Sequence, residues 1–317
     1  MKPESQARPT GASRREFVAT SAGTVAAASI IAGGASPASA QDDEGVDTSI
    51  RWNTPPGDLY NEKRGYGDRD LTGWKGRRVY GATVGIVQLP ANIPMHPGDM
   101  GNPTTFNFPV LYELIPDIDP FWVLAAEPHP VVLEKTIAAC KRLTMQGVRS
   151  IIGNCGFFAN YQPEVSKALD VGVQFFNGSL MQVPMLLTSV GSDKKVGVLT
   201  ANAELLIPSP ALKNSGVAAE DMDRVVIYGN EKGEQMNNIT GETGRFSPKA
   251  FEKELVDLAT RMVEEHPDVG AVVLECTEFP PHAFAIQDAI RRSVWDFTTM
   301  TNFMHAGAMR TPFTGWM

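Results

Sequence analysis

From Val79 onward, short apolar runs alternate with longer amphipathic segments, and this alternation limits the possible folds more than any other feature of the chain. Seven apolar runs are predicted strands: 81–88, 148–153, 172–176, 195–200, 223–228, 270–275 and 293–297. Segments 131–146 and 248–265 are predicted helices, because apolar residues recur on one face of each. Those residues are Leu133, Ile137 and Cys140 in the first, and Phe251, Leu255, Leu258 and Met262 in the second. Strands alternating with helices indicate an α/β fold with parallel sheets.

The chain contains a weak internal repeat. The run Val84-Gly85-Ile86-Val87 recurs as Val196-Gly197-Val198-Leu199, and the apolar run before Cys155 recurs at nearly the same offset before Cys276. The repeat predicts two pseudo-symmetric domains, each a parallel sheet flanked by helices, with the active site in the crevice between them. We assign 79–190 to the first domain, with 295–317 returning to it, and 191–294 to the second.

The first forty residues do not resemble part of this fold. Ser13-Arg14-Arg15-Glu16-Phe17 precedes a mildly apolar run that ends in Ala38-Ser39-Ala40, the pattern of a twin-arginine export signal with an A-x-A cleavage site. The alternative, an N-terminal anchor, is disfavoured because the run falls short of the roughly 20 apolar residues of a membrane span. We expect the twin-arginine translocation machinery to export the protein, which would be periplasmic or extracellular and free of the membrane after cleavage. Residues 41–78 are polar and turn-rich, which predicts an extended N-terminal arm.

The composition excludes several classes of function. The chain has 317 residues, 43% of them hydrophobic, and a formal net charge of −8, without a cluster of Lys and Arg among aromatic residues. Nucleic acid is therefore not an expected partner. The three cysteines form no CxxC pair, no histidine stands at zinc-ligand spacing, and nucleotide-binding motifs are absent. We expect no metal and no cofactor, and we leave the oligomeric state open, a homo-oligomer included.

Cys155 and Cys276 each follow a predicted strand. Because ligands of open α/β sheets bind beyond the carboxyl ends of the strands, the two thiols would face one crevice. One thiolate could remove the proton α to the carboxylate of a small substrate while the opposite thiol returns a proton, which inverts the carbon without a cofactor. We expect a helix starting at Pro280-Pro281 to lower the thiol pKa and to bind the carboxylate. The alternatives are a disulfide and a buried apolar role, the latter expected for Cys140.

Four segments resemble the aspartate/glutamate racemase superfamily, and the resemblance covers roughly residues 80 to 310. They are Asn154-Cys155-Gly156-Phe157-Phe158, Leu180-Met181-Gln182-Val183-Pro184, Val196-Gly197-Val198-Leu199-Thr200-Ala201-Asn202 and Leu274-Glu275-Cys276-Thr277-Glu278-Phe279-Pro280-Pro281. The resemblance implies two pseudo-symmetric domains, no cofactor, and one acid/base cysteine from each domain, Cys155 and Cys276. It also implies substrate contacts at Asn154, Gly156, Thr200, Ala201, Asn202 and Thr277, to which we add the adjacent Phe157 and Glu278.

Other features differ from the amino-acid racemases. Gly156-Phe157-Phe158 stands where those enzymes usually have Asn-Thr after the first cysteine, which indicates a different or bulkier acid than aspartate or glutamate. The same run, the segment around Cys276, and Pro97-Gly98-Asp99 leading to Thr105-Phe106-Asn107-Phe108-Pro109-Val110 resemble the algal dimethylsulfoniopropionate lyases of this superfamily, which cleave a C–S bond.

Three functions follow as hypotheses. The first is a cofactor-independent racemase or epimerase with a two-cysteine mechanism. The alternative is a cysteine-based β-elimination lyase, and a second alternative is an exported two-lobed solute-binding protein.

Overall fold

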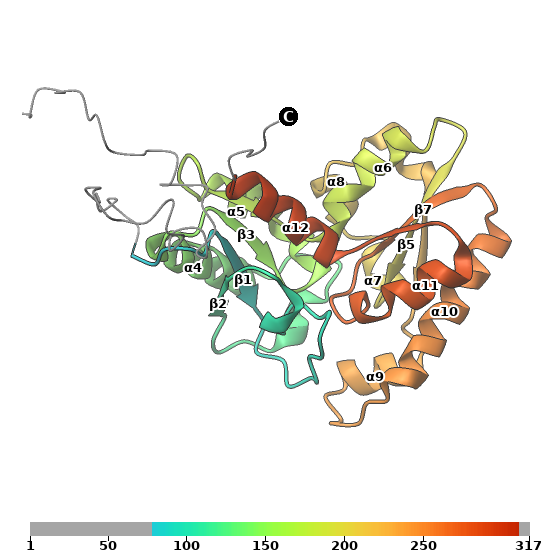
Figure 1. Ribbon diagram of the computed structural model, residues 1–317, viewed down its shortest axis with the longest axis horizontal. Helices are drawn as coiled ribbons and strands as arrows, with labels where there is room; N and C mark the ends of the chain where they lie inside the picture. Colours follow the sequence, from blue (N-terminus) through green and yellow to red (C-terminus); the bar gives the residue numbers. More distant parts are fainter. Residues whose placement is uncertain (1–77, 311–317) are drawn as a thin grey trace, which may run out of the picture. The chain divides into compact units, whose positions relative to one another are not determined.

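The computed structural model describes residues 78–310, which all lie in one compact unit (Figure 1). The predicted export signal and all but the last residue of the predicted arm lie outside the described residues. Within 78–310, no helix combines the length and the apolar character that crossing a bilayer requires.

Two parallel sheets of four strands each carry the structure. The first has the order β2-β1-β3-β4, formed by β1 (Val84–Gln88), β2 (Val110–Leu114), β3 (Ser150–Gly153) and β4 (Gln174–Phe176). The second has the order β6-β5-β7-β8, formed by β5 (Lys195–Thr200), β6 (Val225–Gly229), β7 (Val269–Leu274) and β8 (Ser293–Trp295). The second order repeats the first with each strand number raised by four, so the predicted α/β class and the internal repeat are confirmed.

The central strands of each sheet are apolar because helices cover both of their faces. All four residues of β3 are buried, and so are five of the six in β7. The last residue of β3, Gly153, pairs with Val87 of β1, and the last of β7, Leu274, pairs with Leu199 of β5. The chain therefore leaves the two sheets at equivalent positions, immediately before Asn154-Cys155 and Glu275-Cys276.

The two predicted helices are α4 (Pro130–Gln146) and α10 (Pro248–Glu265). Each helix has proline at its first position and a side-chain cap before it. The side chain of His129 accepts from an amide of the first turn in α4, and that of Ser247 does so in α10. The four apolar residues predicted for α10 are buried. In α4 the fully buried positions are Val132, Thr136, Ala139, Cys140 and Leu143, while Leu133 and Ile137 are only partly buried.

The remaining elements are shorter. The helices are α5 (Gln162–Lys167), α6 (Val183–Ser189), α7 (Ala203–Leu206), α8 (Ala211–Asn214), α9 (Glu234–Thr240), α11 (Ala283–Ile290) and α12 (Phe297–Ala308). The 3-10 helices are η1 (Pro103–Thr105), η2 (Pro120–Val123), η3 (Gly156–Tyr161), η4 (Ser179–Gln182), η5 (Ala219–Arg224) and η6 (Pro280–His282).

Two differences from the predicted elements have physical causes. Strand β2 was not predicted, because it is an edge strand whose residues are only partly buried, so its sequence lacks a continuous apolar run. The predicted strand 293–297 is wrong at its end: Asp296 caps α12 in a reciprocal capping box with Thr299. Helix α12 then packs on the first sheet, where Phe297, Met300 and Met304 join a cluster with residues of β1 and β3 (Figure 1).

The segment before α6 fastens α12 in place. The side chain of Gln182 donates to the carbonyl of Asp296 at 2.9 Å and accepts from the hydroxyl of Thr299 at 2.8 Å. The hydroxyl of Ser179 donates to the carbonyl of Leu274 at the end of β7, at 2.7 Å. The η4 segment Ser179–Gln182 thus joins the end of the second sheet to the helix that covers the first.

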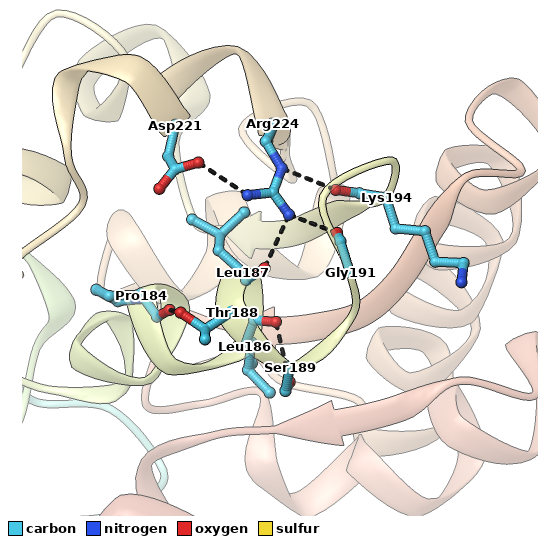
Figure 2. A network of polar contacts seen from close by, with 9 residues as sticks. All are labelled: Pro184, Leu186, Leu187, Thr188, Ser189, Gly191, Lys194, Asp221 and Arg224. Carbon is cyan, nitrogen blue, oxygen red and sulfur yellow. Dashed lines mark hydrogen bonds and ion pairs between the residues drawn. The ribbon is translucent and has the colours of Figure 1, made fainter.

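A half-buried guanidinium, that of Arg224, binds carbonyls at the carboxyl end of α6. Arg224 donates to the carbonyls of Leu187, Gly191 and Lys194 at 2.8, 2.6 and 3.1 Å, and to the carboxylate of Asp221 at 2.8 Å (Figure 2). A positive charge is favourable here because the last carbonyls of a helix carry partial negative charge. Arg224 therefore joins α6, the turn before β5, and η5.

We expect Arg224→Lys to lower the free energy of unfolding by about 1 to 3 kcal/mol, because an ammonium on a flexible stem cannot serve all these acceptors at once. Urea denaturation would measure the loss. Arg291→Lys is the matched control, since the Arg291 side chain is 76% exposed and makes an ion pair with Asp288; its effect should stay within about 0.5 kcal/mol. Equal losses in both variants would contradict the role given to Arg224.

Candidate active site

Cys155 and Cys276 line one pocket, which we call the thiol pocket. It has about 520 Å³ of space between atoms, part of it open to solvent. Its walls are Leu89, Ala91, Ile93, Pro120, Phe121, Val123, Leu124, Asn154, Cys155, Phe157, Ala201, Met236, Ile239, Thr240, Glu275, Cys276, Thr277 and Glu278. No Lys, Arg or His is among these described residues. Residues that follow both sheets thus meet at one site, as the two-domain hypothesis requires.

Backbone hydrogen bonds fix the residue that precedes each of the two cysteines. The amide of Asn154 donates to the carbonyl of Val87, and the amide of Glu275 donates to the carbonyl of Leu199, at 3.0 and 2.7 Å. Each bond extends the strand pairing by one step, so the cysteine is the next residue to leave the sheet. The hydroxyl of Thr277 donates to the carbonyl of Asn154 at 3.1 Å and joins the two turns.

The thiol of Cys276 has a carboxyl partner. Its Sγ donates to Oε2 of Glu278 at 2.7 Å. Burial raises the pKa of Glu278, while contacts with Cys276, its own amide and the Thr277 hydroxyl oppose that rise. Glu278 is therefore placed to accept the proton of the Cys276 thiol.

A second carboxyl, Glu275, is 1% exposed and lies between the sheets. Its Oε2 accepts a hydrogen bond from the hydroxyl of Thr200 at 2.7 Å, whereas its Oε1 is buried without a hydrogen-bond partner. Burial raises the pKa of Glu275 to about 7, against the opposing bonds from Thr200 and the amide of Ala201. Gly156 leaves room for this carboxyl, since a Cβ on Gly156 would lie 1.9 Å from Oε1.

A third buried carboxyl lies behind the pocket wall. Asp99 is 1% exposed; its Oδ1 accepts from the amide of Gly101 at 2.6 Å, and its Oδ2 has no partner. Burial and the charge of Glu278 raise the pKa of Asp99 well above its usual range. The preceding Gly98 has a φ of +105° and packs directly on Pro281, which brings the Asp99 loop against the segment that follows Cys276.

The expected lowering of the thiol pKa is wrong for this site. Burial raises the pKa of both thiols, and the charges of Glu275 and Glu278 raise them further. The amide of Phe157, at the start of η3, favours the Cys155 thiolate but does not offset these effects. The helix start predicted at Pro280-Pro281 is confirmed, because η6 begins at Pro280, but burial and the charges of Glu278 and Glu275 raise the Cys276 pKa all the same.

The other predicted site residues divide into two groups. Asn154, Phe157, Ala201, Thr277 and Glu278 line the thiol pocket. Gly156, Thr200 and Asn202 lie outside its lining. Gly156 and Thr200 contact Glu275 instead. Asn202 caps α7 by accepting from the amide of Leu205 at 3.0 Å, and it lines an adjoining pocket that shares Phe121, Leu124, Ala201, Met236 and Thr240 with the first.

Sequence reasoning missed Glu275 and the walls from η2 and α9. A carboxyl between Leu274 and Cys276, at the end of an apolar strand, was the available signal for Glu275. The three cysteines are free thiols, and Cys140 is fully buried in the core. Within residues 78–310, no group of three or more His, Cys, Asp and Glu side chains is arranged to hold a metal.

The raised pKa of Glu275 predicts a pH-dependent stability. Since the folded state favours the protonated carboxyl, its contribution is present below about pH 4.5 and is lost as the pH rises through about 7. We expect wild type to lose about 2 to 3 kcal/mol of unfolding free energy relative to Glu275→Gln over that interval. Urea titrations at several pH values would measure the difference. The unfolding free energy of Glu204→Gln, at an exposed position of α7, should change with pH as that of wild type does. The same pH dependence in Glu275→Gln would refute the raised pKa of Glu275.

Comparisons with known proteins place this geometry in context. No family model matches the chain. Dimethylsulfoniopropionate lyase 3 of Emiliania huxleyi (strain CCMP1516) is 30% identical over 239 residues, which are 74% of this chain and 61% of the lyase. Lyase 6 of the same strain is 31% identical with the same coverage. The dimethylsulfoniopropionate lyase of Durusdinium sp. clade D is 29% identical over 243 residues, 74% of this chain and 77% of that protein.

Solved structures also match. Allantoin racemase from Klebsiella pneumoniae has a TM-score of 0.49 at 14% identity, over 73% of this chain and 90% of the racemase. An aspartate racemase homologue from Pyrococcus horikoshii OT3 has a TM-score of 0.47 at 17% identity, over 71% and 98%. The chain spans about 61% of the length of the two Emiliania huxleyi lyases described above. The sequence matches confirm the resemblance to the dimethylsulfoniopropionate lyases that the motifs around Cys155 and Cys276 predicted.

Proposed function

We propose that the protein is a cofactor-independent lyase, which removes the proton α to a carboxylate and expels a substituent from the β carbon. The observation that carries the proposal is the meeting of two thiols in one pocket, with the Cys276 thiol bonded to the carboxyl of Glu278. Dimethylsulfoniopropionate is the first candidate substrate, because the similar proteins described above are named as lyases of this compound.

Cys276 and Glu278 act as the base in this proposal. Glu278 takes the thiol proton, and the thiolate then removes the α proton of the substrate. The electron pair of the broken C–H bond forms the C=C bond, and the C–S bond breaks with its electrons leaving on sulfur. The products are acrylate and neutral dimethyl sulfide. The thiol is restored, and Glu278 releases its proton to solvent.

The charge of the pocket supports a cationic substrate. Burial, and then the charges of Glu275 and Glu278, raise the thiol pKa values and so favour the protonated thiols. A sulfonium group near these carboxylates would lower the thiol pKa again, since its positive charge favours the thiolate and offsets the carboxylate charges that disfavour it. The apolar side chains of Leu89, Phe121 and Leu124 would surround the methyl groups.

The substrate carboxylate would need neutral donors, because neither Lys nor Arg is among the described residues that line the pocket. We assign this role to the side-chain NH₂ of Asn154, which lines the pocket and whose Oδ1 accepts from the amide of Leu89 at 2.9 Å. The Thr277 hydroxyl already donates to the carbonyl of Asn154.

A racemase is the second candidate, and the position of Cys155 in the same pocket favours it. A racemase needs a proton donor on each face of the carbon, whereas elimination needs one base. The first test is incubation in D₂O with dimethylsulfoniopropionate, with both enantiomers of aspartate and glutamate, and with allantoin. Acrylate and dimethyl sulfide in the NMR spectrum support the lyase, and deuterium at the α carbon of an intact or inverted acid supports the racemase. Silence with every compound contradicts both.

Substitution of the reacting groups gives a sharper prediction. We expect Cys276→Ser and Glu278→Gln to lower kcat/KM for elimination by about a hundred- to ten-thousand-fold, because the base loses its thiolate or its proton acceptor. Cys155→Ser should lose less, since elimination does not need a second proton donor. Cys140→Ala, in the core of α4, is the control and should retain turnover. Equal losses at Cys155 and Cys276 would favour a two-base reaction instead.

A further inference from the structure

One carboxyl oxygen of Glu275, a residue that lines the thiol pocket, has no partner. Oε1 of Glu275 is buried and accepts no hydrogen bond, although Oε2 of the same carboxyl accepts one from Thr200. A buried carboxylate oxygen without a donor costs free energy, so the site would gain by bringing a positive group to it. The base pair Cys276 and Glu278 of the proposed reaction makes no use of this oxygen.

The other two buried carboxyls are less suited to a ligand. Glu278 already accepts from the Cys276 thiol, and its own amide also favours its ionised form. Asp99 is not part of the pocket lining, and its Oδ1 is held by the amide of Gly101. Glu275 is thus the buried carboxyl that both lines the pocket and retains an oxygen without a partner.

The surroundings of Glu275 fit a bulky cation with an apolar surface. The titratable groups that face it are Cys155 after β3, with Cys276 and Glu278 after β7, and none of them carries a positive charge. The opposite walls are apolar: Leu89, Phe121, Leu124, Met236 and Ile239. An inorganic cation would need several oxygen ligands, whereas a methylated onium group needs apolar contacts and one nearby negative charge.

We propose that Glu275 is the specificity residue of the site and holds the positively charged substituent at the β carbon of the substrate. This inference rests on the proposed lyase function and names the residue that selects a cationic leaving group over a neutral one. The negative charge of Glu275 attracts the onium group. Elimination removes the positive charge of that group, because the sulfide that departs is neutral. Product release is favoured for the same reason.

Gly156 makes this arrangement possible. Any side chain there would displace the Glu275 carboxyl, because a Cβ would lie 1.9 Å from Oε1 and 2.5 Å from Cδ. The glycine that follows Cys155 therefore has a steric task, and a direct contact with the substrate is not needed to explain it.

Two unreactive probes of equal shape test the proposal. β-Alanine betaine carries a trimethylammonium group at the β carbon, and its isosteric neutral analogue has carbon in place of nitrogen. Isothermal titration calorimetry at about pH 8, where Glu275 is ionised, should give wild type at least a ten-fold preference for the betaine. In Glu275→Gln the preference should fall within about two-fold. Glu204→Gln, exposed on α7, should keep it.

A pH series on wild type is the second measurement, and it requires no variant. Protonation of Glu275 should abolish the preference for the betaine as the pH falls through about 7, while binding of the neutral analogue changes less. Two results would overturn the role of Glu275 and leave the lyase proposal standing. One is a preference for the betaine that persists in Glu275→Gln. The other is a wild type that binds both probes equally well. If wild type bound neither probe, the substrate class of the lyase proposal would fail together with this inference.

Discussion

Uncompensated negative charge is the constraint on which the site depends. Glu275 is buried and Glu278 half-buried beside two thiols, and the described lining of the pocket offers them no Lys or Arg. Their charges add to the effect of burial and hold both thiols in the protonated form. A protonated thiol is a poor nucleophile and resists oxidation. The same charges favour entry of a cation. The positive charge of the proposed substrate would then lower the thiol pKa and so activate the base.

The repeated sheet order explains how such a site can be assembled. In each sheet the strand before the cysteine pairs with its neighbour up to the last residue, and one further backbone bond fixes Asn154 or Glu275. The Thr277 hydroxyl then bonds across to Asn154. Ser179 and Gln182 tie the end of β7 to α12, which packs on the first sheet. Two apolar sheets thus hold two carboxyls in a place where burial disfavours their charged forms.

The sequence predicted those parts of the protein that depend on periodicity or repetition. Helix α10 has the predicted bounds, and the placement of Cys155 and Cys276 after equivalent strands follows from the repeated apolar runs. The edge strand β2 and the capped start of α12 depend on partial burial and on side-chain bonds, which periodicity does not report. The thiol pKa values were predicted with the wrong sign, because periodicity does not report the burial of the two thiols or the nearby charges of Glu275 and Glu278 that raise them.

The two thiols are not equivalent, and their difference bears on the choice between elimination and racemisation. Cys276 donates to Glu278, which can take its proton, whereas the Cys155 thiol receives the Phe157 amide and faces the charge of Glu275. A symmetric two-base reaction would favour matched partners for both thiols. One thiol with a proton acceptor, and a second carboxyl left free for a cation, is an arrangement that matches a reaction with one proton transfer and one charged leaving group. The pseudo-symmetry of the fold therefore supports a site whose chemistry is asymmetric.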